Sequence, residues 1–361
     1  MTAAESARSF ACEVCGATAE YAPGTDTLRC PHCATEQPIT PVGRAVHEHA
    51  YTTLITLPLK QPAAQRAPNT FRCPNCQAVT ETDSLSDRCQ FCAAALVADP
   101  SRTERVVPEA VVPFGLDRAA TRTALRKWTR SRWFAPSDLK KVTEAETTKG
   151  SYLPHWTYDA NTLSDYTGQR GDHYYVSQTY TDSNGKTQTR QVRHTRWTSV
   201  SGSVTLSFDD LLVAGTTHVE EEQLDKLEPW PLAEAKPYQD EYLAGFQTVR
   251  YDIEPESGFE TAKKRMNAAI RSQAKRQIGG DEQRVHKVAT SYADLTFKLM
   301  LLPVWFLSYL HHGKTWQVMV NARTAEVIGE RPYSVPKIVA ASLAAAMVIG
   351  AAVWLYLRYR H

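Results

Sequence analysis

"CEVCGATAEYAPGTDTLRCPHC", residues 12 to 33, contains two Cys-x-x-Cys pairs with fourteen residues between them. A second stretch, "CPNCQAVTETDSLSDRCQFC", residues 73 to 92, repeats the arrangement with twelve residues between its pairs. A two-residue gap lets both thiolates of one tight turn face the same ion, and two such turns complete a tetrahedral shell of four thiolates around Zn²⁺. We therefore predict two structural zinc ions, one bound by Cys12, Cys15, Cys30 and Cys33 and the other by Cys73, Cys76, Cys89 and Cys92.

Two alternatives use the same cysteines. A disulfide framework would suit a secreted domain, but "MTAAESARSF" at the start has no apolar segment typical of a signal peptide. The 269 residues after Cys92 contain no cysteine, which fits a disulfide-rich scaffold poorly. A rubredoxin-type iron site has the same four ligands and stays open as an alternative. Segments this short bury little core, so the metal should supply most of their folding energy.

The C-terminal run from Ile338 to Leu357 has 20 residues without a charge, which as a helix spans about 30 Å, the thickness of a bilayer core. We predict a single transmembrane anchor in residues 335–361; a buried helix of a soluble domain is the alternative. Basic residues flank both ends almost equally, so they do not set the orientation. Reduced zinc ligands place the bulk of the chain in the cytoplasm of a membrane-bound protein. Ser342, Ala346 and Gly350 form a row of small residues that could pair two such helices into a homo-oligomer.

The predicted fold is two small β-rich zinc ribbons, each with four cysteines, followed by an α+β domain with mostly antiparallel strands and one C-terminal transmembrane helix. The expected boundaries are ribbon 1 at 1–40, a linker at 41–69, ribbon 2 at 70–98, a linker at 99–113, the α+β domain at 114–334 and the anchor at 335–361. Within the first linker, "AYTTLITL", residues 50–57, favours one strand.

Inside the α+β domain, Asp117 can cap a helix from Arg118 to about Trp133. A short acidic helix is expected in 219–227, and a long one in 257–278 that stops at Gly279-Gly280. "SNGK", residues 183–186, predicts a β-hairpin, and 290–332 alternates well enough for three strands. "YLPHWTYDA" at 152–160 and "LLPVWFLSY" at 301–309 are similar, which favours two strand–hairpin repeats, although chance similarity explains the pair equally well.

Few residues favour an enzyme. The phosphate-loop motif around "GKT", residues 313–315, would need glycine at position 308, which is Ser, and a strand pattern follows where a helix is required. Asp209 and Asp210 could form a catalytic carboxylate pair, but adjacent acids more often mark a solvated turn. We predict no catalytic residues, and an enzyme that uses the central domain is the weakest functional alternative.

Nucleic acid is the partner often associated with zinc ribbons, but the local charge disfavours it. Residues 1–110 contain nine Lys or Arg against twelve Asp or Glu. Each four-thiolate zinc centre adds about two more negative charges. Phosphate binding draws its affinity from cationic side chains, so a nucleic-acid-binding regulator tethered to the membrane is the second choice.

Positive charge is concentrated instead in the helix after Asp117. Its arginines recur every four residues and form one stripe: Arg118, Arg122, Arg126 and Arg130. This stripe could be a solvated face, or a surface that docks on anionic lipid headgroups or an acidic partner. An anchored protein would need little affinity there, because the anchor raises the local concentration.

Several motifs together resemble a bacterial family of membrane proteins with two TFIIB-type zinc ribbons: "VVPFGLDRAA" (111–120), "GSYLPHWTYDA" (150–160), "TRWTSVSG" (195–202) and 301–332. The resemblance implies an α+β body, a membrane helix and, for some members, association with PspA-type phage-shock proteins and flotillin-like proteins. The chain departs from the family pattern in two places. The pattern has Gly after the second Cys of a pair, where Gly16 fits but Ala34, Gln77 and Ala93 do not, and it has Asn-Gly and Thr-Gly in the last hairpin, where this chain has Asn321-Ala322 and Thr324-Ala325.

These observations favour a membrane-anchored scaffold or adaptor that faces the cytoplasm and docks protein partners through its ribbons. The resemblance adds an envelope-stress role as an expectation.

Overall fold

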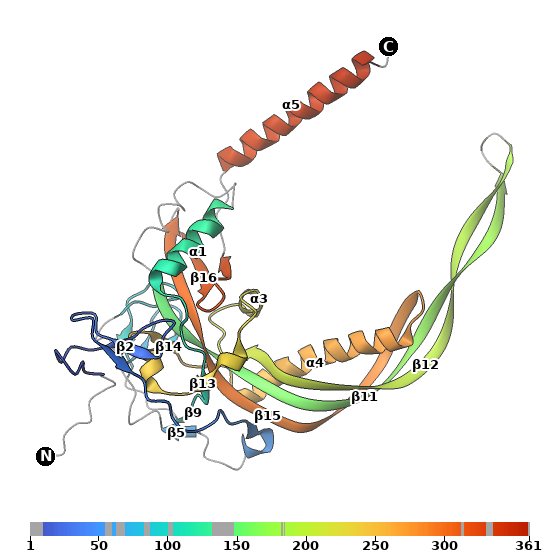
Figure 1. Ribbon diagram of the computed structural model, residues 1–361. Coiled ribbons are helices and arrows are strands. Elements are labelled where there is room, and N and C mark those ends of the chain that lie inside the picture. Colours follow the sequence, from blue (N-terminus) through green and yellow to red (C-terminus); the bar gives the residue numbers. More distant parts are fainter. Residues whose placement is uncertain are drawn as a thin grey trace.

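Three long antiparallel strands form the centre of the protein (Figure 1). The computed structural model describes residues 10–54, 60–62, 69–82, 87–99, 104–131, 148–181, 183, 185–311, 314–329 and 335–359. The strand β11 (Thr148–Thr181) lies between β12 (Thr187–Ala214) and β15 (Glu282–His311) and pairs antiparallel with both. The hairpin predicted at "SNGK" joins β11 to β12, where Thr181 pairs with Thr187. The long strands are continuous where the sequence pattern predicted several shorter ones.

Short strands complete the sheet. β10 (Ala110–Val111) pairs parallel with β15, and β14 (Gln247–Val249) pairs parallel with β11. The other strands of this part, all antiparallel to their partners, are β13 (Lys236–Pro237) beside β10, β16 (Lys314–Asn321) beside β15, and β17 (Val327–Gly329) beside β16. A mostly antiparallel, β-rich domain is therefore confirmed. β10 lies inside the 99–113 segment predicted as a linker, yet it is fully buried in the sheet.

The helices begin and end where local chemistry requires it. α1 (Arg118–Arg130) begins after Asp117, whose carboxylate accepts a hydrogen bond from the backbone N–H of Ala120 at 2.7 Å. It ends three residues before the predicted limit, and position 133 lies outside the described residues. α3 (Glu221–Asp225) is the short acidic helix, and α4 (Pro255–Ile278) ends at Gly279, which has φ of 64°.

α4 covers one face of the three long strands (Figure 1). Its buried side chains recur at three- and four-residue spacing: Phe259, Ala262, Met266, Ile270, Ala274 and Ile278. They pack against strand residues such as Tyr158 and Tyr166. The described residues also contain three 3₁₀ turns: η1 (Tyr51–Leu54), η2 (Leu232–Glu234) and η3 (Asp240–Leu243). The strand predicted in "AYTTLITL" was wrong over its first half, because a two-residue strand, β4 (His49–Ala50), turns directly into η1; positions 55–57 lie outside the described residues.

The same order of elements occurs twice: β10–α1–β11–β12 and β14–α4–β15–β16. The two halves meet where Leu153 pairs with Leu302, and each Leu-Pro segment runs antiparallel across the other. Trp156 donates its indole N–H to the carbonyl of Ile253 at 2.8 Å, and Trp305 donates to that of Leu116 at 2.9 Å. Each of these carbonyls lies one residue before a helix N-cap. The halves are thus related by an approximate two-fold axis.

Shifts in strand register interrupt the long sheet, which curves strongly in Figure 1; one lies between Thr167 and Gly168 of β11, opposite β15. The register of β11 with β12 shifts between Tyr158 and Ala160, and its register with β15 shifts between Asp159 and Asn161. Opposite these shifts, Asp210 and Asp294 have φ of 49° and 51°. Aspartate tolerates the left-handed region better than most residues, and a bulge increases local twist. The predicted solvated turn at Asp209-Asp210 is instead a bulge within a strand.

The eight cysteines lie in two small units, here named the first cysteine module (residues 10–39) and the second cysteine module (residues 69–99 as far as described). The first contains β1 (Glu20–Tyr21), β2 (Thr27–Arg29) and β3 (Glu36–Pro38). The second contains β6 (Asn69–Arg72), β7 (Val79–Thr82) and β8 (Val97–Ala98), and β7 pairs antiparallel with β14. A further pair, β5 (Lys60–Pro62) and β9 (Glu104–Val106), links the flanking segments. The second module therefore extends the main sheet.

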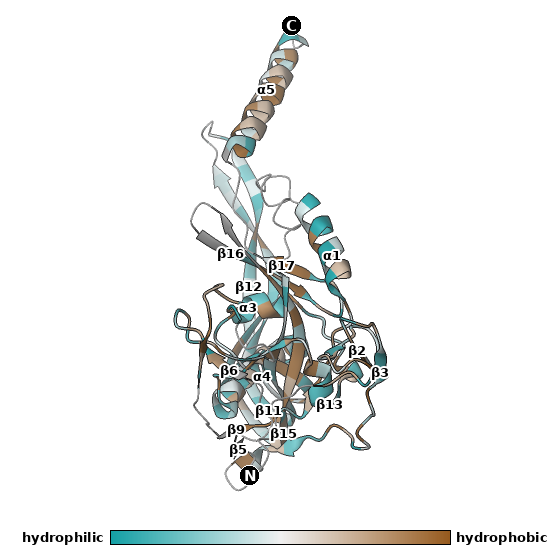
Figure 2. Cartoon of the chain, turned by 90° about the vertical axis from the view of Figure 1, so that its left-hand side faces the viewer, coloured by the Kyte–Doolittle hydropathy of each residue, from teal (hydrophilic) through white to brown (hydrophobic). Residues whose placement is uncertain are grey.

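α5 (Val335–Tyr359) is the apolar C-terminal helix. An 18-residue window within its span from Pro336 to Tyr359 has a mean hydropathy of 2.3, and none of this window is buried against the rest of the protein. In Figure 2 the visible side of its central part is brown or pale, the colours of hydrophobic and intermediate residues. Among the described residues, one helix is therefore long and apolar enough to cross a membrane.

Candidate metal centres

Each module brings four cysteine sulfurs together. All four Sγ atoms of each set lie within 4.8 Å of one another. Cys12 and Cys33 are 3.5 Å apart, as are Cys15 and Cys30. In the second set, Cys73 lies 3.4 Å from Cys92, and Cys76 lies 3.6 Å from Cys89. Four sulfurs at about 2.3 Å from a central ion would be roughly 3.8 Å apart, so both sets fit a tetrahedral ion after small adjustments. The separations exceed the roughly 2 Å of a disulfide.

The backbone has the same form in all four Cys-x-x-Cys turns. In each, the N–H of the residue after the second cysteine donates to the carbonyl of the first, at 2.8 to 3.0 Å. That residue is in the left-handed region in every case: Gly16 (φ 72°), Ala34 (59°), Gln77 (64°) and Ala93 (60°). The departure from glycine at three positions has not changed the turn. It leaves three residues in a conformation that costs a Cβ-bearing residue about 1–2 kcal/mol.

Without an ion, the thiols of one set hold different pKa values. A hydrogen bond from the Thr35 hydroxyl, at 3.1 Å, lowers the pKa of Cys33 to about 6. A backbone hydrogen bond from Ala17 lowers the pKa of Cys15, but contact with Cys30 acts in the opposite direction, and the resulting pKa is raised to about 12. In the second set, burial raises the pKa of Cys76 to about 11. Burial also disfavours the thiolate of Cys73, but hydrogen bonds from backbone N–H groups outweigh it and lower the pKa of Cys73 to about 7. Four thiolates cannot coexist this closely without a cation, and Zn²⁺ would supply the charge that ionises them all.

Each module packs on the body through aromatic side chains. Tyr21 of the first module contacts Tyr242, with ring centroids 5.5 Å apart, and its backbone N–H donates to Ala244 at 3.0 Å. Phe91 of the second module contacts Phe306 edge-on at 5.5 Å. Cys73 and Cys89 are themselves buried in the same cluster as Phe306. Both cysteine modules are therefore continuous with the main core.

Polar contacts fix the second module as well. Arg250, just after β14, donates its Nε to Glu81 of β7 at 2.5 Å, and both side chains are largely buried. Gln247 donates to Asp87 at 2.6 Å, and Asp87 also pairs with Lys149 at the start of β11. A buried ion pair costs several kcal/mol when one partner is removed, so these contacts couple the module to both halves of the body.

The arginine stripe of α1 has mixed exposure. Arg126 and Arg130 are exposed, Arg122 is half-buried, and the Arg118 guanidinium lies 6.0 Å from the ring of Trp305. The helix packs through Leu125, which is 1% exposed. Arg118 is exposed as well, so three of the four arginines are open to solvent and Arg122 is partly covered.

Sequence reasoning did not find a third cluster of titratable groups, because its members come from three distant segments. Glu48, Asp159 and Asp209 have carboxylate oxygens within 4.8 Å of one another, beside the bulges. Lys298, 5% exposed, donates to Glu48 at 2.8 Å and to Asp210 at 2.5 Å. Burial raises the pKa of Asp159 to about 6, whereas a hydrogen bond from Asp159 lowers that of Glu48 to about 2. The ammonium group of Lys298 already balances negative charge in this cluster. We therefore explain the cluster as a set of contacts that stabilises the bent part of the sheet.

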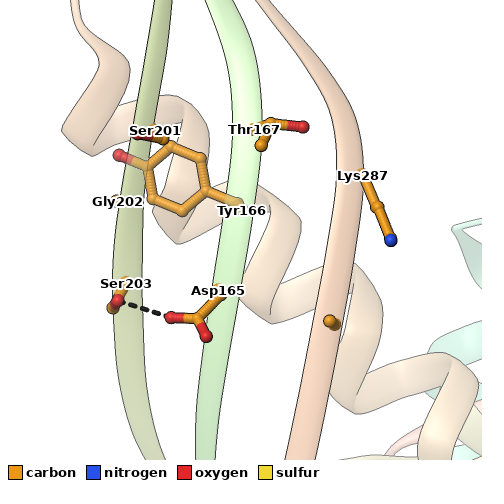
Figure 3. Close-up of a pocket in the computed structure, with 8 residues that line it drawn as sticks. Asp165, Tyr166, Thr167, Ser201, Gly202, Ser203 and Lys287 are labelled. Atoms are coloured by element: carbon orange, nitrogen blue, oxygen red, sulfur yellow. Dashed lines mark hydrogen bonds between the residues drawn. The ribbon is translucent and has the colours of Figure 1, made fainter.

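A shallow pocket lies on the three long strands (Figure 3). Ser203 donates to Asp165 at 2.6 Å beside it, and Tyr166 lies over Gly202, where a Cβ would come within 2.8 Å of the phenol oxygen. The remaining lining residues are Thr167, Ser201, Lys287 and Ala289. No His or Cys is among these described lining residues, so the pocket holds no Ser-His or Cys-His pair; its ionisable side chains are Asp165, Tyr166 and Lys287.

Comparison with known proteins gives one distant relative. The chain is 26% identical over 249 residues to the uncharacterized protein YdjG of Bacillus subtilis (strain 168). The aligned region covers 68% of this chain and 70% of that protein. No family model matches the chain. No solved structure matches it either.

Proposed function

We propose that the two cysteine modules are zinc ribbons that hold structural Zn²⁺, and that the chain is a membrane-anchored, cytoplasm-facing scaffold for protein partners. The observation that carries this proposal is the combination of two closed four-cysteine sites with an apolar helix that the rest of the chain does not bury. Closed thiolate shells leave no position for substrate and persist in a reducing compartment. An unburied apolar helix of 24 residues requires a lipid or protein environment.

The packing of the modules refines where a partner could dock. Their inner faces are committed to the body, so the metal-binding turns that point outward are the available surface. In the first module Val14 is 71% exposed; it lies inside the turn between Cys12 and Cys15 and directly precedes the exposed Cys15. An exposed apolar side chain held on a rigid metal turn is suited to a protein contact. The resemblance to double zinc-ribbon membrane proteins supports PspA-type or flotillin-like proteins and an envelope-stress role as the first partners to test.

The anchor and the metal are tested separately. Carbonate extraction of membranes should leave the full chain in the pellet and release a chain that ends at residue 334. A full chain that is released as well would overturn the anchor. Metal analysis of the purified full chain should give two zinc ions per chain; iron in their place would favour the rubredoxin-type alternative.

Docking is tested by capture from detergent-solubilised membranes. Val14→Asp changes the exposed turn without removing a ligand, whereas Cys73→Ser removes a buried ligand of the second module. If the first module docks a partner, Val14→Asp should lose it while the zinc content stays at two per chain. Recovery of the same partners with Val14→Asp and with Cys73→Ser would exclude the modules as docking sites. Salt-dependent binding of DNA or RNA by the full chain would instead favour the nucleic-acid-binding regulator.

A further inference from the structure

The hairpin of β11 and β12 extends beyond the rest of the sheet (Figure 1). The pairing of β15 with β11 ends where Gly171 meets Glu282. From Asp172 to Arg196, β11 and β12 continue as a two-stranded ribbon, here named the arm. A two-stranded ribbon is at best marginally stable in water on its own, so an arm of this length should serve a contact.

The base of the arm is held firmly. The backbone N–H of His173 donates to Asp281 at 2.6 Å, and its ring Nε2 lies 2.8 Å from a carboxylate oxygen of Glu282. The guanidinium of Arg284 lies 3.8 Å from the centre of the Trp197 ring. Trp197 in turn covers Gly171, where a Cβ would come within 2.9 Å of the indole. These contacts fix the direction in which the arm leaves the body.

The two faces of the arm differ in chemistry. Cross-strand register places the following side chains on one face, here named the aromatic-basic face: Tyr174, Val176, Tyr180, Arg190, Val192 and Arg196. The Arg196 guanidinium lies 5.4 Å from the Tyr174 ring, and that of Arg190 lies 5.6 Å from Tyr180. The opposite face consists mainly of Ser, Thr and Gln, with Tyr175 and Arg193 among them.

The aromatic-basic face is exposed. Tyr174, Val176 and Tyr180 are each more than 40% exposed. It continues the sheet face that α4 covers, because Tyr166, eight residues before Tyr174 on β11, packs against Ile270. Surface aromatic and valine side chains gathered in this way mark an interaction site.

Charge defines what can occupy this face. Arg190 and Arg196 lie on this face together with one acid, Asp172, whereas Arg193 lies on the opposite face. On the same side of the sheet, the solvent face of α4 adds Lys264, Arg271 and Lys275, all exposed. A binding partner of this face should therefore carry negative charge and should also have an apolar layer that contacts the tyrosine and valine side chains. Tyrosine and arginine together are the side chains that suit the headgroup region of a bilayer.

We propose that the aromatic-basic face lies on the anionic phospholipid headgroups of the membrane that α5 crosses. The inference rests on the proposed anchoring by α5. The arm and α5 extend toward the same side of the body in both views (Figures 1 and 2). A tether of this kind turns a weak headgroup contact into a stable one by raising the local concentration. The arm then sets how the body and its cysteine modules stand on the membrane surface.

The experiment separates the arm from the anchor. Because none of the α5 span is buried, a chain that ends at residue 334 keeps every described core cluster. Its binding to vesicles of phosphatidylcholine with phosphatidylglycerol, and to vesicles of phosphatidylcholine alone, is measured by flotation. We expect binding to the anionic vesicles only, weakened by added salt.

Matched variants test the face. Arg196→Gln should weaken binding about fivefold, as expected for one cation at a lipid surface, whereas Arg193→Gln on the opposite face should change it by less than about twofold. Replacing Tyr174, Val176 and Tyr180 by Ser should abolish binding, and Tyr175→Ser should not. Equal effects of Arg196→Gln and Arg193→Gln would overturn the proposal. So would loss of binding only when Arg118, Arg126 and Arg130 are replaced, or binding to a single-stranded oligonucleotide without binding to vesicles. Release of the full chain by carbonate would reject α5 as an anchor but would leave this outcome unchanged.

Discussion

Trp156 and Trp305 occupy equivalent positions in the two halves of the body, and each donates its indole N–H to the last carbonyl before a helix N-cap. Each ring also contacts an aromatic residue of the entering segment edge-on at 5.2 Å, Tyr251 for Trp156 and Phe114 for Trp305. Trp156 of the first half therefore holds the segment that leads from β14 into α4, and Trp305 of the second half holds the segment that leads from β10 into α1.

Trp156→Phe and Trp305→Phe should therefore have similar effects. Each leaves a carbonyl at a helix entry without its donor and removes one ring, which should lower the free energy of unfolding by roughly 1–3 kcal/mol. Urea denaturation of the full chain in detergent measures the change. Tyr175→Phe on the exposed arm serves as the control and should stay within about 0.5 kcal/mol. A loss for only one of the two tryptophans would show that the halves are not energetically equivalent.

His155 makes stability depend on pH. It is buried, 2% exposed, and burial lowers its pKa to about 4, against the backbone contact with Leu153 that raises it. The unfolded chain binds this proton at a pKa of about 6.5, so stability is complete above that value and falls as the pH drops toward 4. Between pH 7 and pH 5 the loss should be about 2 kcal/mol.

The repeat supplies the control for this prediction. Val304 occupies the position in β15 that His155 occupies in β11, so His155→Val places there a residue that the same environment already accepts. Protonation of the cysteine thiolates would affect both proteins equally, and the difference between the two proteins isolates the histidine. If wild type and His155→Val lose the same stability between pH 7 and pH 5, the buried histidine does not titrate as expected.

Cysteine spacing and hydrophobic patterning predicted the parts of the fold that depend on local signals. The four-cysteine sets, the Asp117 cap, the stop at Gly279 and the apolar helix all follow from a few neighbouring residues. The place of β10 could not be predicted, because two apolar residues among prolines become a strand only through pairing with Met300 and Leu301.

The second metal site illustrates the same limit. Its ligands were predicted from spacing, but the attachment of its module was not, because pairing of Thr80 with Val249 joins segments that are 169 residues apart. The two faces of the arm could not be predicted either, because they are defined by the register between β11 and β12. Non-local pairing carries information that composition and periodicity do not contain.

Loss of one metal ion should disturb the two modules differently. Cys15→Ser and Cys76→Ser each remove the second cysteine of the first pair. Because β7 pairs with β14, Cys76→Ser should increase amide hydrogen exchange in both Val79–Thr82 and Gln247–Val249. Cys15→Ser should increase exchange in Glu20–Tyr21 and Thr27–Arg29 and leave β14 protected. Increased exchange of β14 in both variants would mean that the first module supports the main sheet as strongly as the second.

Ala93 offers a test of the metal turns that leaves every ligand in place. A φ of 60° destabilises the folded state for a residue with a Cβ atom but not for glycine. Glycine partly offsets this advantage, because its greater conformational freedom stabilises the unfolded chain. Ala93→Gly should therefore raise the free energy of unfolding by about 0.5–1 kcal/mol and leave the zinc content unchanged. Ala95→Gly, two residues away in an extended segment that pairs with Arg88, should lower it by a similar amount. Thermal unfolding of the zinc-loaded chain compares the two, and the same sign for both variants would show that the left-handed turn is not what limits stability at this site.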